Sequence, residues 1–275
     1  MTPQSFDFIA ALVKARSGLM LTPDKRYMLE SRLTPLLKRE ALADLDALAL
    51  RLRDPRAAAL AEAVTEALTT NESSFFRDGK PFDHLKRALP RLVAARPPGA
   101  VLRVWSAACS TGQEAYSVAM IAAEMGRELE GRRVEILGTD IAGEVLARAR
   151  DGLFTQFEVQ RGLPVRQLVK HFTQDQGRWR VAAELRAMTR FDRCNLLGDL
   201  RPMGRFDVIF CRNVLIYFDP PTKSRVLGAL AGQLAPDGVL YLGGAETVLG
   251  LTDRLVPVPS ERGAYELPRA VAAAG

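Results

Sequence analysis

The stretch Val101-Leu-Arg-Val-Trp-Ser-Ala-Ala-Cys-Ser-Thr-Gly-Gln-Glu-Ala-Tyr-Ser117 decides the fold of this chain. Its β-branched and aromatic start, 101 to 105, predicts a strand, and helix-period apolar spacing from 115 to 125 predicts a helix. Small residues between them, Ala107 and Gly112 included, allow a ligand to approach the backbone in front of the helix N-terminus. The stretch therefore predicts the first strand-to-helix turn of a nucleotide-binding α/β sheet.

The same turn excludes a diphosphate ligand. Only Gly112 is present of the G-x-G-x-x-G pattern, and Glu114 lies in the first helical turn, where it would repel phosphate. An acid there suits a cationic or hydroxyl-bearing ligand, and S-adenosylmethionine carries both a sulfonium and an ammonium group. Any tightly packed strand-to-helix turn has small residues as well, so the turn alone leaves a purely structural interpretation open.

Composition indicates a globular protein. The 275 residues are 48% hydrophobic, which is enough for one large domain and a small one. We find no apolar run of membrane-spanning length and no signal-peptide pattern at the N-terminus, so we expect a cytoplasmic protein. The three cysteines show no C-x-x-C spacing, and we expect free thiols and no metal site.

The net charge of +6 favours an acidic partner, with compositional drift as the alternative. On the second predicted helix, Lys25, Arg32 and Arg39 are seven residues apart and share one face. We predict that this face docks an acidic helical protein. The alternative is an ordinary solvated face.

The order of elements predicts three regions. Residues 1 to 70 contain only helical patterns, with starts at Thr22-Pro23, Asp44 and Asp54-Pro55. After a polar linker and a helix over 81 to 95, strands and helices alternate from residue 100, as in a parallel sheet. The second strand, 134 to 138, leads to Asp140, which is placed to accept hydrogen bonds from ribose hydroxyls or, alternatively, to cap the next helix.

Residues 151 to 190 interrupt the alternation. A helix over 163 to 172 and a hairpin over 172 to 181, turning at Asp175-Gln-Gly177, predict a small antiparallel insertion. The sheet then resumes with strands at 188 to 193, 206 to 211 and 239 to 243. We expect an antiparallel pair, 254 to 257 and 264 to 267, to close it.

Taken together, the chain resembles the bacterial chemotaxis receptor (methyl-accepting chemotaxis protein) glutamate methyltransferases of the CheR type. The resemblance rests on motifs in the family's order: TNESSFFR (70–77), RVWSAACSTGQEAYSVAM (103–120), LGTDI (137–141), CNLL (194–197), FDVIFCRNVLIYFD (206–219) and LAPDGVLYLG (234–243). These enzymes methylate receptor glutamates from S-adenosylmethionine.

The resemblance implies a class I S-adenosylmethionine-dependent methyltransferase fold, Rossmann-like with a mostly parallel seven-stranded sheet. It also implies an all-helical N-terminal domain and a small antiparallel β-subdomain. We expect a receptor-facing domain at 1–70, a linker and helix at 71–99 that contribute to the cofactor site, and the methyltransferase domain at 100–275 with the insertion at 165–188.

The resemblance also implies the site residues. Those matching cofactor contacts are Asn71, Ser73, Arg77, Ala107, Gly112, Glu114, Asp140, Asn195, Leu196, Arg212 and Asn213. Tyr217 matches the tyrosine near the transferred methyl group, and Arg77 would orient the cofactor or hold the glutamate carboxylate. The implied partners are chemoreceptors, with no nucleic acid and no membrane insertion, for an enzyme that acts as a monomer.

The chemistry fits the composition. A carboxylate is ionised at neutral pH, so the reaction needs no general base, and neither His84 nor His171 lies in a strand-end loop. A nicotinamide-dependent oxidoreductase is disfavoured by the missing glycines. A non-catalytic module that binds the cofactor or a receptor remains the alternative. The short turn at 175–177 predicts that no receptor tail peptide is bound.

Overall fold

The computed structural model describes residues 1–268 and contains two compact units. The first comprises Met1–Thr70 together with Tyr217–Thr222, and the second comprises Asn71–Ile216 and the chain from Lys223 onward. Within the described residues, no helix combines the length and the apolar character needed to cross a bilayer. The return of 217–222 to the first unit is a feature that the sequence analysis did not anticipate.

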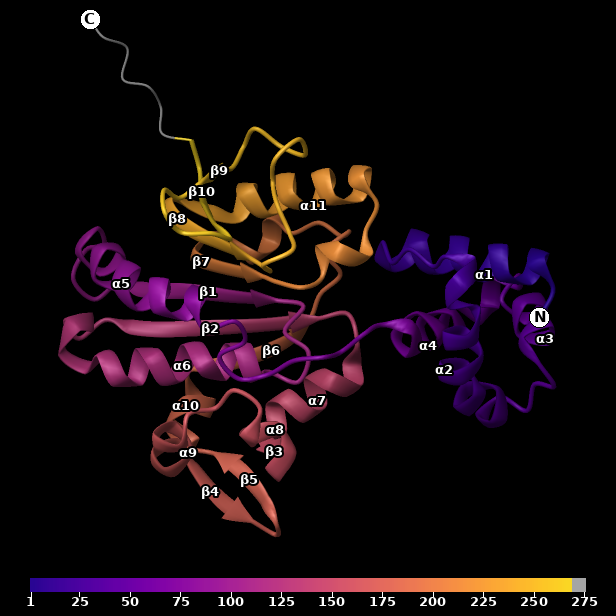
Figure 1. The fold of residues 1–275 in the computed structure, drawn as a ribbon, viewed down its shortest axis with the longest axis horizontal. Helices are drawn as coiled ribbons and strands as arrows, with labels where there is room; N and C mark the ends of the chain where they lie inside the picture. The colour runs from indigo at the N-terminus through magenta and orange to yellow at the C-terminus, as the bar shows by residue number, and fades with distance from the viewer. Residues whose placement is uncertain (269–275) are drawn as a thin grey trace, which may run out of the picture. The chain divides into compact units, whose positions relative to one another are not determined.

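The first unit is helical, as predicted (Figure 1). Its α-helices are α1 (Pro3–Ser17), α2 (Arg26–Arg39), α3 (Leu45–Arg51) and α4 (Ala58–Leu68). Thr2, Asp44 and Asp54 each accept a hydrogen bond from a backbone N–H of the first turn that follows. The expected starts at Pro23 and Pro55 open short 3-10 turns, Pro23–Lys25 and Pro55–Ala57, and the α-helices begin one turn later.

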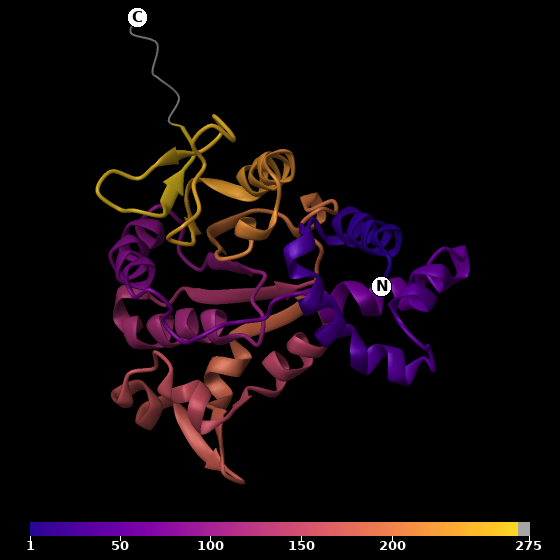
Figure 2. The same cartoon turned by 45° about the vertical axis from the view of Figure 1, so that its right-hand side comes forward.

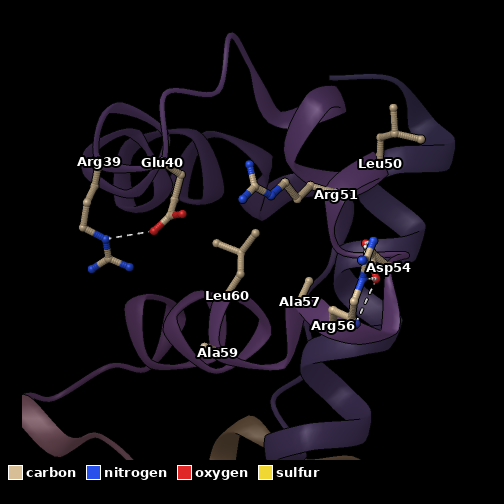
Figure 3. Close-up of a pocket in the computed structure, with 9 residues that line it drawn as sticks. All are labelled: Arg39, Glu40, Leu50, Arg51, Asp54, Arg56, Ala57, Ala59 and Leu60. Atoms are coloured by element: carbon tan, nitrogen blue, oxygen red, sulfur yellow. Dashed lines mark hydrogen bonds and ion pairs between the residues drawn. The ribbon is translucent and has the colours of Figure 1, made fainter.

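Apolar side chains from all four helices form one core, which includes Ile9, Leu29, Leu48 and Val64. A hollow on this unit has a volume of about 680 Å³ and is lined in part by Leu60 of that core. Figure 3 shows its lining residues. Its charged side chains are already partly paired, since Arg39 contacts Glu40 and Arg56 contacts Asp54. The hollow therefore offers little unbalanced charge.

Arg32 has a structural role that its position on the helix face did not reveal. Its guanidinium donates to the carbonyl oxygens of Leu68 and Thr69, each at 2.8 Å, and to the Thr70 hydroxyl at 3.2 Å. These are the last carbonyls of α4, which have no partner within the helix. Arg32 therefore joins α2 to the end of α4, whereas Lys25 and Arg39 remain as candidate docking charges.

We expect Arg32→Ala to lower the free energy of unfolding by about 1–3 kcal/mol, because two helix-end carbonyls lose a charged donor. Lys25→Ala is the matched control, since its side chain has no hydrogen-bond partner within residues 1–268. Urea unfolding of the full chain, followed by circular dichroism, measures both. Equal losses for the two variants would contradict the structural role of Arg32.

The second unit is built on a seven-stranded sheet in the order β6-β2-β1-β7-β8-β10-β9. Its strands are β1 (Val101–Ala107), β2 (Arg133–Asp140), β6 (Thr189–Arg193), β7 (Phe206–Cys211), β8 (Leu234–Leu242), β9 (Val256–Pro257) and β10 (Ala264–Glu266). All neighbours run parallel except at β10, which is antiparallel to both β8 and β9. The predicted fold class and the closing antiparallel pair are confirmed.

Helices cover this sheet (Figures 1 and 2). They are α5 (Lys80–Ala94), α6 (Gln113–Met125), α7 (Gly143–Asp151) and α11 (Pro220–Gln233). α5 and α6 contact each other and share one core with the sheet, in which Phe82 of α5 stacks on Phe210 of β7 at 5.5 Å between ring centroids. Every residue of β7 is buried, as expected of a central strand.

The insertion is larger than the sequence indicated. The hairpin β4 (Phe172–Asp175) and β5 (Arg178–Val181) is confirmed, but β3 (Leu153–Phe154) adds a third strand against β5. Three short helices accompany it: α8 (Gln156–Gln160), α9 (Val165–His171) and α10 (Ala183–Ala187). The three-stranded sheet therefore also draws on residues before 165, the expected start of the insertion. A two-residue strand has too little periodicity to be visible in the sequence.

β8 also differs from the expectation, because it begins at Leu234 and not at 239. Its pairing with β7 is irregular between Phe206 and Val208, where a bulge occurs. Pro236 and Gly238 lie at this bulge, and so they can be part of the strand. The helix before it, α11, ends at Gln233. Asp219 caps that helix by accepting from the Thr222 N–H at 3.0 Å.

Candidate functional site

The carboxyl ends of β1 and β7 meet the linker that precedes α5 at a polar cavity. Its lining residues are Glu72, Ser73, Ser74, Arg77, Ala108, Cys109, Ser110, Glu114, Arg212 and Asn213. The cavity measures about 30 Å³, so the linker lies closely over the strand ends.

The loop after β1 is shaped to admit a ligand to its backbone. Ala108, Ser110 and Gly112 all have positive φ, at 55°, 52° and 90°. A Cβ on Gly112 would lie 3.0 Å from the Ala149 side chain, so the turn has no room for a larger residue. Ala107, the last residue of β1, is fully buried below this loop.

Asp140 lies where β2 ends and is buried. Its carboxylate accepts from the Ser110 N–H at 2.9 Å and from the Ala142 N–H at 3.0 Å. It thus holds the β1 loop and the entry to α7 at the same time. A carboxylate accepts hydrogen bonds in about four directions, which is the chemistry that hydroxyl donors require.

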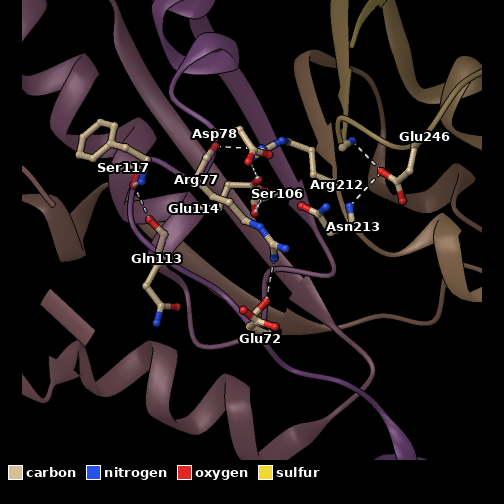
Figure 4. Close-up of polar contacts among 12 residues, drawn as sticks. Glu72, Arg77, Asp78, Ser106, Gln113, Glu114, Ser117, Arg212, Asn213 and Glu246 are labelled. Atoms are coloured by element: carbon tan, nitrogen blue, oxygen red, sulfur yellow. Dashed lines mark hydrogen bonds and ion pairs between the residues drawn. The ribbon is translucent and has the colours of Figure 1, made fainter. Parts of the chain in front are cut away.

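Arg212 and Glu114 form the buried centre of the site (Figure 4). The Arg212 guanidinium, 2% exposed, donates to Glu114 Oε2 at 3.1 Å, to Asp78 Oδ2 at 2.6 Å and to the Arg77 carbonyl at 2.9 Å. The Ser106 hydroxyl donates to Glu114 Oε1 at 2.8 Å. Burial raises the pKa of Glu114 above its usual value, while Arg212 and Ser106 act against that shift.

The linker is anchored at two points on the N-terminal side of Arg77. The Ser110 hydroxyl donates to the Asn71 carbonyl at 2.8 Å, and Phe75 packs edge-on against Phe154 and Phe172 at ring distances of 4.9 and 5.6 Å. The Arg77 guanidinium lies at the cavity and donates to the Glu72 carbonyl at 3.3 Å. Arg77 is therefore the cationic group of the cavity that is only lightly engaged.

The remaining predicted residues are distributed as follows. Asn213 lines the cavity with φ of 59°, whereas Asn195 holds its own turn by accepting from the Leu197 N–H at 3.0 Å. Leu196 is buried beside it. Tyr217 lies in the short segment that belongs to the helical unit, where it packs against that unit's core.

Two functional acids were missed. Asp78 pairs with Arg212, and Glu246 accepts hydrogen bonds from the loop that follows Arg212. Both acids lie in loops, and the residues to which they hydrogen-bond, Arg212 for Asp78 and Asn213 for Glu246, are distant in sequence. For Glu246 a signal existed, since it lies three residues after Gly243, a glycine at the end of a buried strand.

The cysteines are free thiols, as expected. Cys109 and Cys211 are buried at the ends of β1 and β7, and burial raises the pKa of both thiols far above the usual value. A raised pKa keeps them protonated, and a protonated thiol is a poor nucleophile. They therefore serve as packing at the floor of the site.

Comparison with known proteins matches this arrangement over nearly the whole chain. The family model described as CheR methyltransferase, SAM binding domain, matches residues 71–264, and that described as CheR methyltransferase, all-alpha domain, matches 4–69. Chemotaxis protein methyltransferase 1 of Pseudomonas aeruginosa is 38% identical over 253 residues, covering 90% of this chain and 92% of that protein.

Two further relatives agree. Chemotaxis protein methyltransferase Cher2 of Pseudomonas putida is 36% identical over 253 residues, covering 90% of this chain and 92% of its own. Chemotaxis protein methyltransferase 1 of Vibrio cholerae is 38% identical over 263 residues, covering 92% of this chain and 93% of that protein. S-adenosylmethionine is therefore the cofactor, and the residues present fit it: the Asp140 carboxylate is an acceptor suited to hydroxyl donors, and the small residues of the β1 loop suit the polar end.

We expect Asp140→Ala to weaken the binding of S-adenosylhomocysteine by about 1.5–3 kcal/mol, or about 10- to 150-fold in Kd, because charged hydrogen bonds to the ribose are lost. Isothermal calorimetry measures it. Asp199→Ala is the control, since Asp199 is an exposed acid paired with Arg201. An unchanged Kd for Asp140→Ala would remove Asp140 from the cofactor site.

Proposed function

We infer the reaction from the family: the chain belongs to the CheR methyltransferases, and we propose that it methylates glutamate side-chain carboxylates of chemoreceptors. Bound S-adenosylmethionine supplies an electrophilic methyl group on a good leaving group. The product would be a glutamyl methyl ester, made in chemotactic adaptation. Everything else required of the protein is binding and orientation.

The observation that carries this proposal is the character of the cavity. It contains a lightly engaged guanidinium, Arg77, and no histidine lines it. His84 is instead hydrogen-bonded to Tyr241, and His171 is buried beneath the β-subdomain. A reaction that starts from an ionised carboxylate needs a cation to hold it and no base to deprotonate it.

In this proposal Arg77 binds the target carboxylate through its planar pair of N–H donors. Glu114 and Arg212 fix the linker so that Arg77 keeps its place above the β1 loop. Tyr217 is the proposed hydrogen-bond donor near the transferred methyl group. The proposed cofactor contacts are the residues named by the resemblance, with Arg212 acting through the linker that it holds.

We expect Arg77→Ala to lower kcat/KM by about 10²-fold, as does the loss of other charge-stabilising donors. Arg77→Lys retains the charge without the planar fork and is expected to lie between the wild type and Arg77→Ala. The measurement is transfer of radiolabelled methyl groups to a chemoreceptor cytoplasmic fragment, followed by alkaline hydrolysis. Ester label is released as methanol.

An alkali-stable product would reject the glutamyl ester. Tight S-adenosylmethionine binding without transfer to any chemoreceptor would instead favour the alternative, a non-catalytic binding module. Wild-type activity in Arg77→Ala would contradict the proposed role of Arg77 but not the proposed formation of a methyl ester.

We propose that the helical unit binds the receptor and that Lys25 and Arg39 meet an acidic helical surface there. This proposal places a soluble monomer in the cytoplasm, with no role for nucleic acid. It rests on charge complementarity and on the match of 4–69 to the family's all-alpha domain. Arg32 is left out, because its guanidinium is engaged by α4.

We expect a receptor carboxy-terminal pentapeptide to show no measurable binding, and receptors without the tail to be methylated normally. The hairpin turns in two residues, Gln176 and Gly177, with φ of 48° and 77°, and its outer strand β4 is four residues long. So short an edge offers little backbone for strand addition. Micromolar affinity in a peptide titration, abolished by deletion of 173 to 180, would overturn this expectation.

A further inference from the structure

Glu246 gathers four backbone N–H groups on one carboxylate. Oε2 accepts from Asn213 at 2.9 Å and from Gly243 at 2.6 Å, and Oε1 accepts from Val214 at 3.0 Å and Ile216 at 3.2 Å. Figure 4 shows the side chain directed at Asn213 from the loop after β8. One side chain therefore ties together the segments that follow β7 and β8.

The surrounding backbone is shaped for this contact. Asn213 has φ of 59°, a left-handed conformation that is costly for a side-chain-bearing residue. A Cβ on Gly243 would lie 2.8 Å from both Asn213 Nδ2 and Glu246 Oε2, so only glycine allows the approach. The strained residue persists because the carboxylate satisfies N–H groups that the ended strand leaves without partners.

The segment held in this way reaches the reaction site. Asn213 lines the same cavity as Arg77 and Glu114, and it directly follows Arg212. The fourth bonded residue, Ile216, directly precedes Tyr217 in the chain. A shift of Glu246 would therefore displace Asn213 and the start of the turn that carries the proposed methyl-contacting tyrosine.

We propose that Glu246 is a positioning residue for methyl transfer, which sets the 213–216 segment in its reactive geometry. This inference rests on the proposed function. Three of the four bonds hold residues 213–216, where Asn213 is the one proposed cofactor contact that Glu246 bonds. Asp140, another proposed cofactor contact, accepts instead from the Ser110 and Ala142 N–H groups. The carboxylate should therefore control turnover more than cofactor affinity.

Glu246→Gln is the test variant. The amide keeps the shape but has only one oxygen, so one pair of N–H groups faces an NH2 donor. We expect kcat to fall about 10²-fold, as displacements of about 1 Å can cause, with the Kd for S-adenosylhomocysteine changed less than about threefold. Amide hydrogen exchange at Val214 and Ile216 should become faster in the full-length variant.

Glu261→Gln is the matched control. Glu261 is also a partly buried carboxylate, paired with Arg87 and absent from the cavity, and its amide variant should keep wild-type turnover. A second test combines Glu246→Gln with Asn213→Ala. If Glu246 acts through Asn213, the double variant should lose little more than the worse single variant, because coupled residues are non-additive.

Turnover of Glu246→Gln within twofold of wild type, or additive losses in the double variant, would overturn the proposal. So would a loss that appears only in the Kd for S-adenosylhomocysteine. If Glu246→Gln does not fold, Gly243→Ala serves instead, since its Cβ displaces the same carboxylate, and it is expected to lower kcat with the Kd retained. A wild type that forms no alkali-labile ester defeats the proposed function itself, a result distinct from any of these.

Discussion

The buried guanidinium of Arg212 is the interaction on which the catalytic unit depends. It joins three segments that are far apart in the chain: the end of β7, the start of α6 through Glu114, and the linker through Asp78 and the Arg77 carbonyl. Removing one partner of such a buried network leaves an uncompensated charge, which costs several kcal/mol. These bonds therefore fix the backbone of the linker at the strand ends, and they fix the position of Arg77 with it.

The architecture could be predicted from the sequence because most helices and strands show hydrophobic periodicity and turn residues within short windows. The β1 turn, the fully buried β7 and the hairpin 172–181 each follow from residues close together in the chain, and each was found. The motifs supplied what periodicity could not, namely which strand ends carry polar side chains. β3 was missed because it exists only through its pairing with β5, and the true start of β8 because a bulge absorbs Pro236.

The sequence predicted which residues belong to the site, but it did not predict which group each side chain contacts. A motif names Arg212 and Arg32 without showing whether a guanidinium faces a ligand or a carbonyl oxygen. In the folded chain Arg212 donates to Glu114 and Asp78, and Arg32 donates to the end of α4. These partners lie 36 or more residues away, so no window of sequence contains both members of the pair. Glu246 escaped for the same reason, since its partners are backbone N–H groups of another strand end.

Three acids, Asp140 at the end of β2, Glu246 after β8 and Glu114 in the first turn of α6, hold the backbone and side chains around the site. Asp140 and Glu246 each hold backbone N–H groups of strand-end loops, and Glu114 holds Arg212. Carboxylates suit this role, since one side chain accepts several N–H bonds and shapes loops that no strand pairing can reach. In the proposed reaction these groups fix the loops around Arg77, so that electrostatics would orient the target carboxylate without any proton transfer.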